Sequence, residues 1–318
     1  MSLKSLPKLS AFARVWESAG MLLVLAVLFL LCSVFVGNFL TVTNLRGLAL
    51  AVSTIGMVSC TMMFCLAAGD FDLSVGSVVA FAGVLGATVM NATGSVAAGV
   101  AAALASGALV GFVNGVFVAG LGINALITTL ATMQIVRGLG FIASDGRAVG
   151  IRTDAFFALG NTAWLGVPAP VWLTVACFAL FGVLLNRTIF GRNTLAIGGN
   201  REAAYLAGVP VTRIKIVIFT LQGMVAAFAG LVLSARMTSG QPNTSQGFEL
   251  EVISACVLGG VSLSGGVARI GAVVAGVLIM GLVQNAMNLL NIPPFYQYVA
   301  RGCILLAAVM LDRLKQRA

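Results

Sequence analysis

Two carboxylates lie where one long apolar stretch of the chain ends and the next begins. Asp70 and Asp72 belong to the sequence G-D-F-D-L-S-V-G-S at 69–77. Ionisable groups beside membrane-like segments usually face a bundle interior or a cavity, because lipid does not solvate them. Gly69 permits a sharp break, and Asp72 or Ser74 can cap the helix that follows. Two interpretations stay open, a surface turn with a capping aspartate and a part of a transport pathway or its gate.

Uncharged polar side chains recur inside the apolar stretches. Amides and hydroxyls can pass a neutral polar solute by exchanging hydrogen bonds, and they bind it too weakly to trap it. They can equally bond neighbouring helices to each other, at about 0.6 kcal/mol per contact. The candidate pathway residues, besides Asp70, Asp72 and Ser74, are Asn114, Asn124, Thr128, Gln134, Gln284, Asn285 and Asn288.

Arg137 is a cation inside an apolar stretch, and it must pair, reach the interface or face water. Asp145 follows two helical turns later and is a suitable partner. We expect a structural pair between these two side chains rather than a contact with a substrate.

The one sizeable polar and basic segment of the chain covers residues 187–213. It contains G-R-N-T-L-A-I-G-G-N-R-E-A-A-Y-L-A-G-V-P at 191–210. Asn200 is a good N-cap, Glu202 suits the first turn of a helix, and Gly208 followed by Val-Pro ends it. The pattern predicts a short amphipathic helix, which is either an ordinary connection or a docking surface for another protein.

Several kinds of chemistry are excluded. Histidine is absent, and the six cysteines all lie in apolar segments without metal-ligand spacing. No Gly-rich loop of the G-x-x-x-x-G-K-[ST] type is present, so the chain cannot bind ATP in that way. We therefore expect no catalytic residue, no metal site and no cofactor bound by this chain.

The composition predicts an all-α, polytopic membrane protein. Hydrophobic residues make up 60% of the 318 and charged residues only 8%, whereas soluble proteins carry about a quarter. About ten transmembrane segments (roughly 8–10) are expected, because each needs about 20 apolar residues. They are 19–36, 48–68, 75–91, 96–121, 125–143, 170–186, 214–235, 249–261, 270–290 and 296–312.

The segment 249–261 is too short to cross a bilayer alone, which predicts a broken or re-entrant segment. The longest polar stretches, 144–169 and 187–213, are too short to fold independently. Residues 1–318 are therefore expected to form one transmembrane domain.

The distribution of charge predicts the orientation. The net charge is +9, which in a soluble domain would suggest nucleic acid but here reflects Lys and Arg beside the spans. The chain has 18 such residues, and twelve fall on one side of the predicted topology, namely Lys4, Lys8, Arg14, Arg187, Arg192, Arg201, Arg213, Lys215, Arg269, Arg313, Lys315 and Arg317. The positive-inside rule places both termini and the segment 187–213 in the cytoplasm, and 144–169 outside.

An internal repeat is also indicated. At an offset of 190, Gly69, Leu73, Ser74 and Gly76 align with Gly259, Leu263, Ser264 and Gly266, and Arg137-Gly138 and Arg301-Gly302 form a second pair. Paired broken segments in two halves of a transporter indicate its binding region. The spacing between the two markers differs between the halves, so the duplication stays an expectation.

Four motifs together resemble a known family. G-D-F-D-L-S-V at 69–75, I-N-A-L-I-T-T-L-A-T-M-Q-I-V-R-G at 123–138, G-R-N-T-L-A-I-G-G-N at 191–200 and L-G-G-V-S-L-S-G-G at 258–266 are similar to permeases of bacterial ABC sugar importers, in the ribose/xylose/arabinose branch. The resemblance covers nearly the whole chain. Asp70-Phe71, the turn at 144–146 and L-T-V-A-C at 173–177 are most similar to members that carry L-arabinose.

The resemblance implies roles for the polar segment. E-A-A-x-x-x-G at 202–208 corresponds to the coupling helix that docks on the ATPase in that family, which implies this role for Asn200, Arg201, Glu202, Ala203, Ala204 and Gly208. Ile218 has the expected spacing, but the leucine-proline pair of the motif is not in register.

The family further implies an importer in the bacterial inner membrane. Its expected partners are a second permease copy, a cytoplasmic ATPase that holds ATP and Mg²⁺, a periplasmic sugar-binding protein and a monosaccharide, with no nucleic acid. The alternative is a secondary transporter driven by an ion gradient, for which only Asp70 and Asp72 are available as mid-span ionisable groups.

Overall fold

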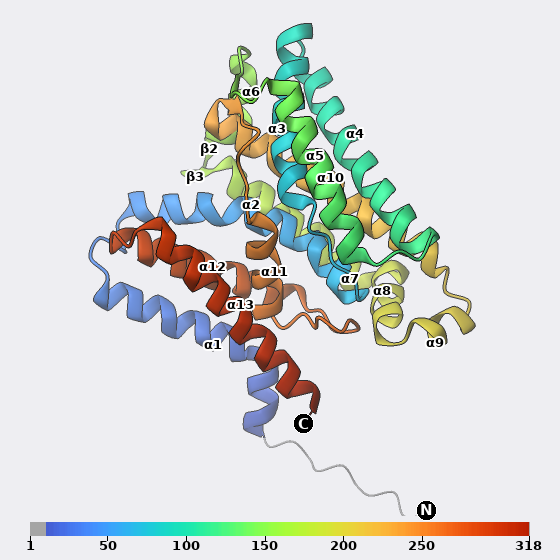
Figure 1. Ribbon diagram of the computed structural model, residues 1–318. Coiled ribbons are helices and arrows are strands. Elements are labelled where there is room, and N and C mark those ends of the chain that lie inside the picture. Colours follow the sequence, from blue (N-terminus) through green and yellow to red (C-terminus); the bar gives the residue numbers. More distant parts are fainter. Residues whose placement is uncertain (1–10, 318) are drawn as a thin grey trace, which may run out of the picture.

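The chain is almost entirely helical, as its composition predicts. The computed structural model describes the backbone of residues 11–317 and the side chains of residues 20–310, so Lys4 and Lys8 lie outside the described residues. Figure 1 shows the helices, which are α1 (Ala11–Phe35), α2 (Val42–Ala67), α3 (Val75–Thr93), α4 (Val96–Gly115, extended by a π-helical turn at Val116–Gly120), α5 (Ala125–Ser144), α6 (Asp154–Asn161), α7 (Ala169–Arg187), α8 (Ile189–Gly199), α9 (Arg201–Leu206), α10 (Val211–Met237), α11 (Phe248–Leu258), α12 (Ile270–Leu289) and α13 (Pro294–Arg317).

Seven helices in the described part of the chain are long and apolar enough to span a membrane. They are Val42–Ala67, Val75–Thr93, Val96–Gly120, Ala125–Ser144, Ala169–Arg187, Val211–Met237 and Ile270–Leu289. Two shorter apolar helices, Gly20–Phe35 and Pro294–Met310, belong to α1 and α13. The prediction of an all-α, multi-pass protein is confirmed, whereas the total of about ten segments stays a prediction.

The eighth predicted segment, 249–261, corresponds to α11. Its 11 residues rise only about 16 Å, roughly half of the hydrocarbon thickness. The residues before it, 241–247, are not helical. They run beside α3, because Gly240 approaches Gly83 and the Ser245 carbonyl approaches Gly76.

Two short antiparallel ladders are the only strands in residues 11–317. β1 (Val149–Gly150) pairs with β4 (Ser239–Gly240), and β2 (Ala163–Trp164) pairs with β3 (Val167–Pro168). The first ladder joins the loop after α5 to the end of α10, with Val149 opposite Gly240. The second closes the turn before α7.

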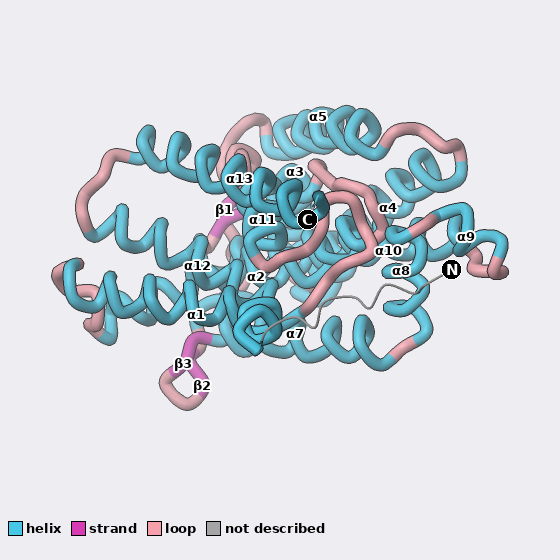
Figure 2. Tube along the Cα trace, turned by 90° about the horizontal axis from the view of Figure 1, so that it is seen from below, coloured by secondary structure: helices cyan, strands magenta, loops and turns pink. Residues whose placement is uncertain are grey.

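The helices form two groups around α2. Figure 1 shows α3, α4, α5 and α10 on one side, and α1, α12 and α13 on the other. α2 contacts α10 in the first group and α12 in the second, as well as α7 and α11. In the view of Figure 2, α5 and α7 lie at opposite edges of the molecule, with α2 and α11 between them. α2 is buried along most of its length, which suits a helix that is apolar on all sides.

Glycines allow α4 and α10 to pack closely. A Cβ atom on Gly107 would lie 2.3 Å from the Gly223 carbonyl oxygen, and one on Gly111 would lie 2.1 Å from the Phe219 carbonyl oxygen. Gly115 approaches Ile216 in the same way. Small residues at every fourth position let helix backbones approach, which is the usual way that membrane helices associate.

Candidate functional site

The polar segment after α7 forms two helices instead of one. In α9 the Asn200 Oδ1 atom accepts a hydrogen bond from the Ala203 N–H (2.9 Å), which is the predicted N-cap. The helix ends at Leu206, and Gly208 adopts a positive φ of 82° that favours glycine. The unpredicted helix α8 fills residues 189–199, because Thr188 caps it by accepting from the Gly191 N–H.

α9 lies on the surface of the protein. Arg201, Glu202 and Ala203 are exposed, and only Ala204 of the helix is buried. Tyr205 and Leu206 are 70% and 79% exposed. An exposed aromatic and leucine pair beside charged residues is typical of a protein-docking surface. The sequence pattern located this helix but did not single out these two apolar side chains.

α8 packs tightly against the end of α2 and against the loop after α11. A Cβ atom on Gly198 would lie 1.8 Å from the Ala67 carbonyl oxygen at the end of α2. Gly265 lies against Gly198, and the Gly266 N–H donates to the same Ala67 carbonyl (2.9 Å). The end of α2, the loop after α11 and the polar segment therefore meet at one point.

An ion pair connects this point with α10. The Lys215 Nζ atom lies 2.8 Å from Asp70 Oδ2, and both side chains are nearly inaccessible. Burial raises the pKa of the Asp70 carboxyl, and the Lys215 ammonium opposes that rise. Lys215, which the sequence places at the start of the span 214–235, is a buried residue in the first turns of α10.

Asp72 begins a buried polar network. Its Oδ1 atom accepts from the Ser74 N–H (2.9 Å) and from the Ser74 hydroxyl (2.6 Å). The Asn114 amide donates to the Ser74 Oγ atom (3.1 Å), and its own oxygen accepts from the Thr132 hydroxyl (2.7 Å). The network joins the loop after α2 with α4 and α5. It brings together three predicted pathway residues, Asp72, Ser74 and Asn114.

The expected capping of α3 takes a different form. Ser74 is the residue before α3, but its side chain makes no capping hydrogen bond. Asp72 instead bonds the Ser74 N–H two residues on, which is a local turn. Burial raises the pKa of the Asp72 carboxyl to about 6, although the bonds from Ser74 act against the rise.

The other predicted pathway residues lie apart. Asn124 is exposed and caps α5 by accepting from the Leu126 N–H (2.9 Å), and Gln134 is exposed on the same helix. Thr128 is buried, and its hydroxyl has no hydrogen-bond partner among the described residues. Asn285 exchanges two hydrogen bonds with Asn44, at 3.0 and 2.8 Å.

Asn288 and Gln284 follow on the same helix, α12. The Asn288 oxygen accepts from the Gln297 amide (2.8 Å), which joins α12 to α13. The Gln284 side chain is half-buried in a pocket between α2, α11, α12 and α13. Asn124, Asn285 and Asn288 therefore make hydrogen bonds that stabilise the fold, and their role in transport stays a prediction.

The expected Arg137–Asp145 pair is wrong. Asp145 is exposed and ends α5 in a left-handed conformation. The Arg137 guanidinium instead donates to the carbonyl oxygens of Pro242 (2.8 Å) and Thr244 (2.7 Å). Backbone that is not helical needs such partners when it passes between helices. Arg137 therefore stabilises the non-helical segment before α11.

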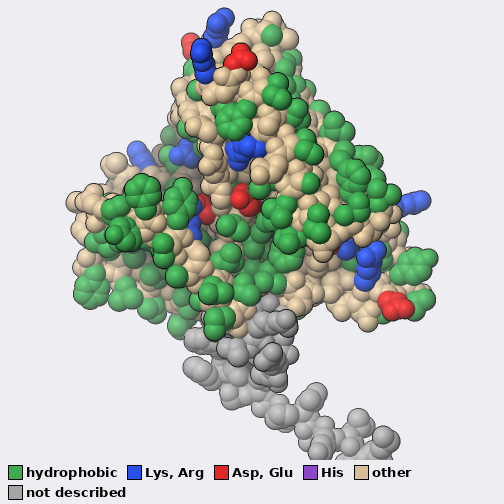
Figure 3. Space-filling view, viewed as in Figure 1, with side chains coloured by type: hydrophobic (Ala, Val, Ile, Leu, Met, Phe, Trp, Pro, Cys, Tyr) green, Lys and Arg blue, Asp and Glu red, His purple; other side chains and the backbone are tan. Residues whose placement is uncertain are grey.

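Two acidic residues that were not among the predicted site residues, Glu249 and Glu251, lie beside Arg137 and Arg301. Glu249 interacts electrostatically with Arg137, and Glu251 pairs with Arg301. The sequence did indicate them, because two acidic residues in an apolar stretch require partners. Figure 3 shows basic and acidic side chains gathered in the hollow between the two groups of helices. The two arginines of the proposed repeat thus act on one segment, 242–251, from α5 and α13.

Comparison with known proteins identifies relatives along nearly the whole chain. A family model described as the branched-chain amino acid transport system / permease component matches residues 44–309. The L-arabinose transport system permease protein AraH of Escherichia coli (strain K12) is 66% identical over 313 residues, which cover 98% of this chain and 95% of that protein.

More distant relatives extend the range of sugars. The L-arabinose ABC transporter permease protein AraH of Azospirillum brasilense is 54% identical, with 95% and 90% of the two chains covered. The ribose import permease protein RbsC of Bacillus subtilis (strain 168) is 39% identical, with 96% and 95% covered. No solved structure matches the chain.

Proposed function

The chain belongs to the family of transport-system permease components, and from this we propose that it is the membrane permease of an ABC importer for L-arabinose. The observation that carries the proposal is the 66% identity to an L-arabinose permease over 98% of the chain. The identity to a ribose permease is much lower, at 39%. The permease is not itself the ATPase, so ATP and Mg²⁺ are bound by a separate subunit.

The proposed partners follow from this role. A second copy of the chain completes the pathway, a binding protein delivers the sugar, and an ATPase docks on α9. The exposed Glu202, Tyr205 and Leu206 support α9 as the docking surface. Docking there would act directly on α8 and, through Gly198, on the end of α2.

The proposed orientation places α8, α9 and both termini in the cytoplasm of a bacterium, with the chain in the inner membrane. The excess of Lys and Arg in these segments supports it. About ten segments cross or enter the membrane, and α11 with the non-helical 241–247 forms the broken one. The polar network of Asp72, Ser74 and Asn114 belongs to the pathway or its gate.

Uptake by proteoliposomes tests the transport function. The chain is reconstituted with its ATPase and binding protein, and labelled L-arabinose uptake is measured with ribose, xylose and galactose as competitors. We expect uptake only with internal ATP, and inhibition by unlabelled L-arabinose before the other sugars. Uptake driven by a proton or sodium gradient alone would make the chain a secondary transporter and contradict the proposal.

Two substitutions test the docking role of α9. We expect Glu202→Arg and Gly208→Glu to reduce ATPase co-purification and uptake by about tenfold or more, because each changes the exposed surface or its ending turn. Membrane insertion should be unchanged, since Glu202 contacts nothing in the core. Asp154→Asn, at an exposed position of α6, is the control. Normal co-purification and uptake in both variants would remove α9 from the interface.

A further inference from the structure

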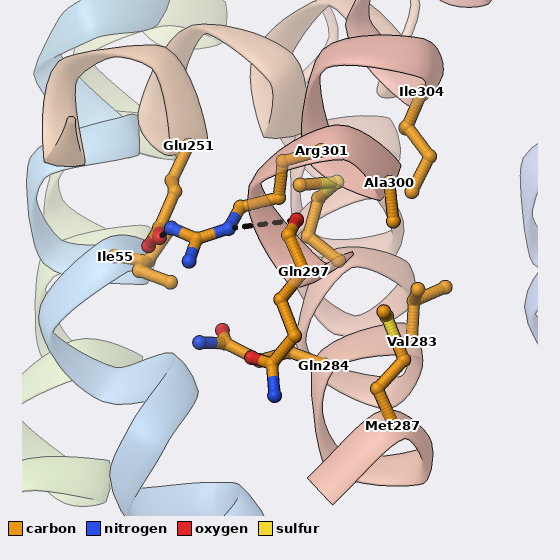
Figure 4. Close-up of a pocket in the computed structure, with 10 residues that line it drawn as sticks. Ile55, Glu251, Val283, Gln284, Met287, Gln297, Ala300, Arg301 and Ile304 are labelled. Atoms are coloured by element: carbon orange, nitrogen blue, oxygen red, sulfur yellow. Dashed lines mark hydrogen bonds and ion pairs between the residues drawn. The ribbon is translucent and has the colours of Figure 1, made fainter. Parts of the chain in front are cut away.

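A pocket lies between α2, α11, α12 and α13, in the second group of helices (Figure 4). Most of its walls are aliphatic or methionine side chains. Four polar side chains enter it, and they are Glu251, Gln284, Gln297 and Arg301. Three helices contribute these four groups, so the pocket exists only in the folded protein. Few polar groups in an apolar enclosure are typical of small-molecule sites.

Arg301 is held from three directions. Its guanidinium pairs with the Glu251 carboxylate, and its Nε atom donates to the Gln297 carbonyl oxygen (3.4 Å). The guanidinium carbon also lies 4.8 Å from the centre of the Tyr298 ring. The Arg301 side chain is only 23% exposed and the Glu251 side chain only 14%. A buried ion pair adds little to stability over an apolar replacement, so its presence calls for a functional reason.

Gln284 is the unpaired member of the pocket. The amides near it are already paired, because Asn285 on α12 bonds Asn44 on α2, and Asn288 on α12 accepts from Gln297 on α13. Within the described residues the Gln284 amide has no hydrogen bond. Figure 4 shows its side chain directed toward the space beside the Glu251–Arg301 pair. An amide with free donors and acceptors in an apolar wall is available to a polar ligand.

We propose that this pocket binds the monosaccharide during transport, an inference that rests on the proposed function. Glu251 accepts hydrogen bonds, Arg301 donates them, and Gln284 and Gln297 do both. The pair has no net charge, which suits a neutral polyhydroxylated solute rather than an ion. A site that hydrogen-bonds hydroxyl groups is also selective, because a ligand without them leaves buried polar groups unpaired.

The pocket is closed in the present conformation. Its open volume is about 10 Å³, enough for one water molecule and not for a sugar. A sugar enters only when α13 moves away from α11 and α12. Sugar hydroxyls then replace the contacts that Arg301 and Glu251 make with each other. The ion pair is thus the empty state of the site.

The test measures sugar transported per ATP hydrolysed in the reconstituted complete importer. Gln284→Leu puts an apolar side chain of similar size in place of the amide and breaks no hydrogen bond, so its melting temperature should match the wild type. We expect uptake per ATP to fall about tenfold, since a hydroxyl loses its partner. Arg301→Lys, which keeps the charge but loses the planar fork, should lower the same ratio. Gln246→Leu, an exposed glutamine, is the matched control.

The possible results separate the two proposals. A wild-type importer that takes up no L-arabinose contradicts the proposed function, and the sugar site fails with it. If the wild type transports normally and Gln284→Leu and Arg301→Lys keep its ratio, only the sugar site is overturned. A melting temperature and ATPase rate that fall together in Arg301→Lys, with Gln284→Leu normal, would also overturn the site and make the ion pair structural.

Discussion

Asp72 shows how the fold decides the chemistry of a single side chain. The residue is 1% exposed, and its Oδ2 atom has no hydrogen-bond partner among the described residues. Burial raises the carboxyl pKa from 3.8 to about 6. The native protein therefore binds an extra proton between about pH 4 and pH 6. Its stability falls as the pH rises through this window and stays lower above it.

Asp72→Asn should remove this pH dependence. The neutral amide avoids the cost of ionisation above pH 6, up to about 3 kcal/mol, but buries an unpaired NH₂ at about 1–3 kcal/mol. We expect a melting temperature near the wild-type value at pH 7.5, and a flatter profile from pH 4 to 7.

The melting profile of Asp72→Asn is measured in detergent, and uptake is measured in proteoliposomes. An unchanged pH slope would contradict the buried titration. Slower uptake at normal expression would support a gate role for Asp72. Full uptake would mean that Asp72 only stabilises the turn before α3.

The Asp70–Lys215 pair predicts strong coupling. Lys215→Met leaves a buried carboxylate alone and should destabilise the protein by about 3–5 kcal/mol, or raise the pKa of Asp70 further. Asp70→Asn combined with Lys215→Met should recover most of that loss. A double-mutant cycle on thermal unfolding gives the coupling energy. Additive effects would show that the two side chains do not interact.

At the scale of elements, α8 is the part that connects the surface with the interior. It is followed directly by α9. Through Gly198 it contacts both the end of α2 and the loop after α11. Packed interfaces do not deform continuously, so we expect a movement of α9 to be passed through α8 to both loops. The close contact needs a residue without Cβ at this point.

Gly198→Ala and Gly199→Ala form a matched pair for this contact. An added Cβ on Gly198 would meet backbone at 1.8 Å, whereas one on Gly199 would meet nothing within 4 Å. We expect Gly198→Ala to lower uptake by about tenfold or more, because the backbone must shift, and Gly199→Ala to leave it nearly unchanged. Uptake per milligram of reconstituted protein is the measurement. Equal effects of the two substitutions would contradict the tight contact.

At the scale of the whole molecule, charge and apolar length set the orientation in the membrane. Arg147 lies in the loop between α5 and α6, and Arg201 lies on α9. Both are exposed. We expect Arg147→Cys to react with a membrane-impermeant maleimide in intact spheroplasts, and Arg201→Cys only in inverted vesicles. The background carries Cys303→Ala, since Cys303 is exposed. The opposite labelling pattern would invert the topology.

Local patterns were enough to predict the long apolar helices and α9, but not α6 and α8. Asn200 and Gly208 limit α9 as predicted, because capping and left-handed glycine act within a few residues. The Arg137–Asp145 pair failed for the opposite reason. Its true partners, Pro242 and Thr244, are more than 100 residues away in sequence. No local spacing reports such contacts.

The sequence alone was sufficient for the multi-pass helical class, the short helix with E-A-A-x-x-x-G and the family. These depend on hydrophobic length, capping and motif, each encoded in neighbouring residues. Tertiary structure was needed to place Lys215 against Asp70, Asn114 against Ser74 and Arg301 against Glu251. A buried polar group must find a partner wherever the packed helices supply one. Which helix supplies it is a property of the packing, so the polar interior had to be read from the fold.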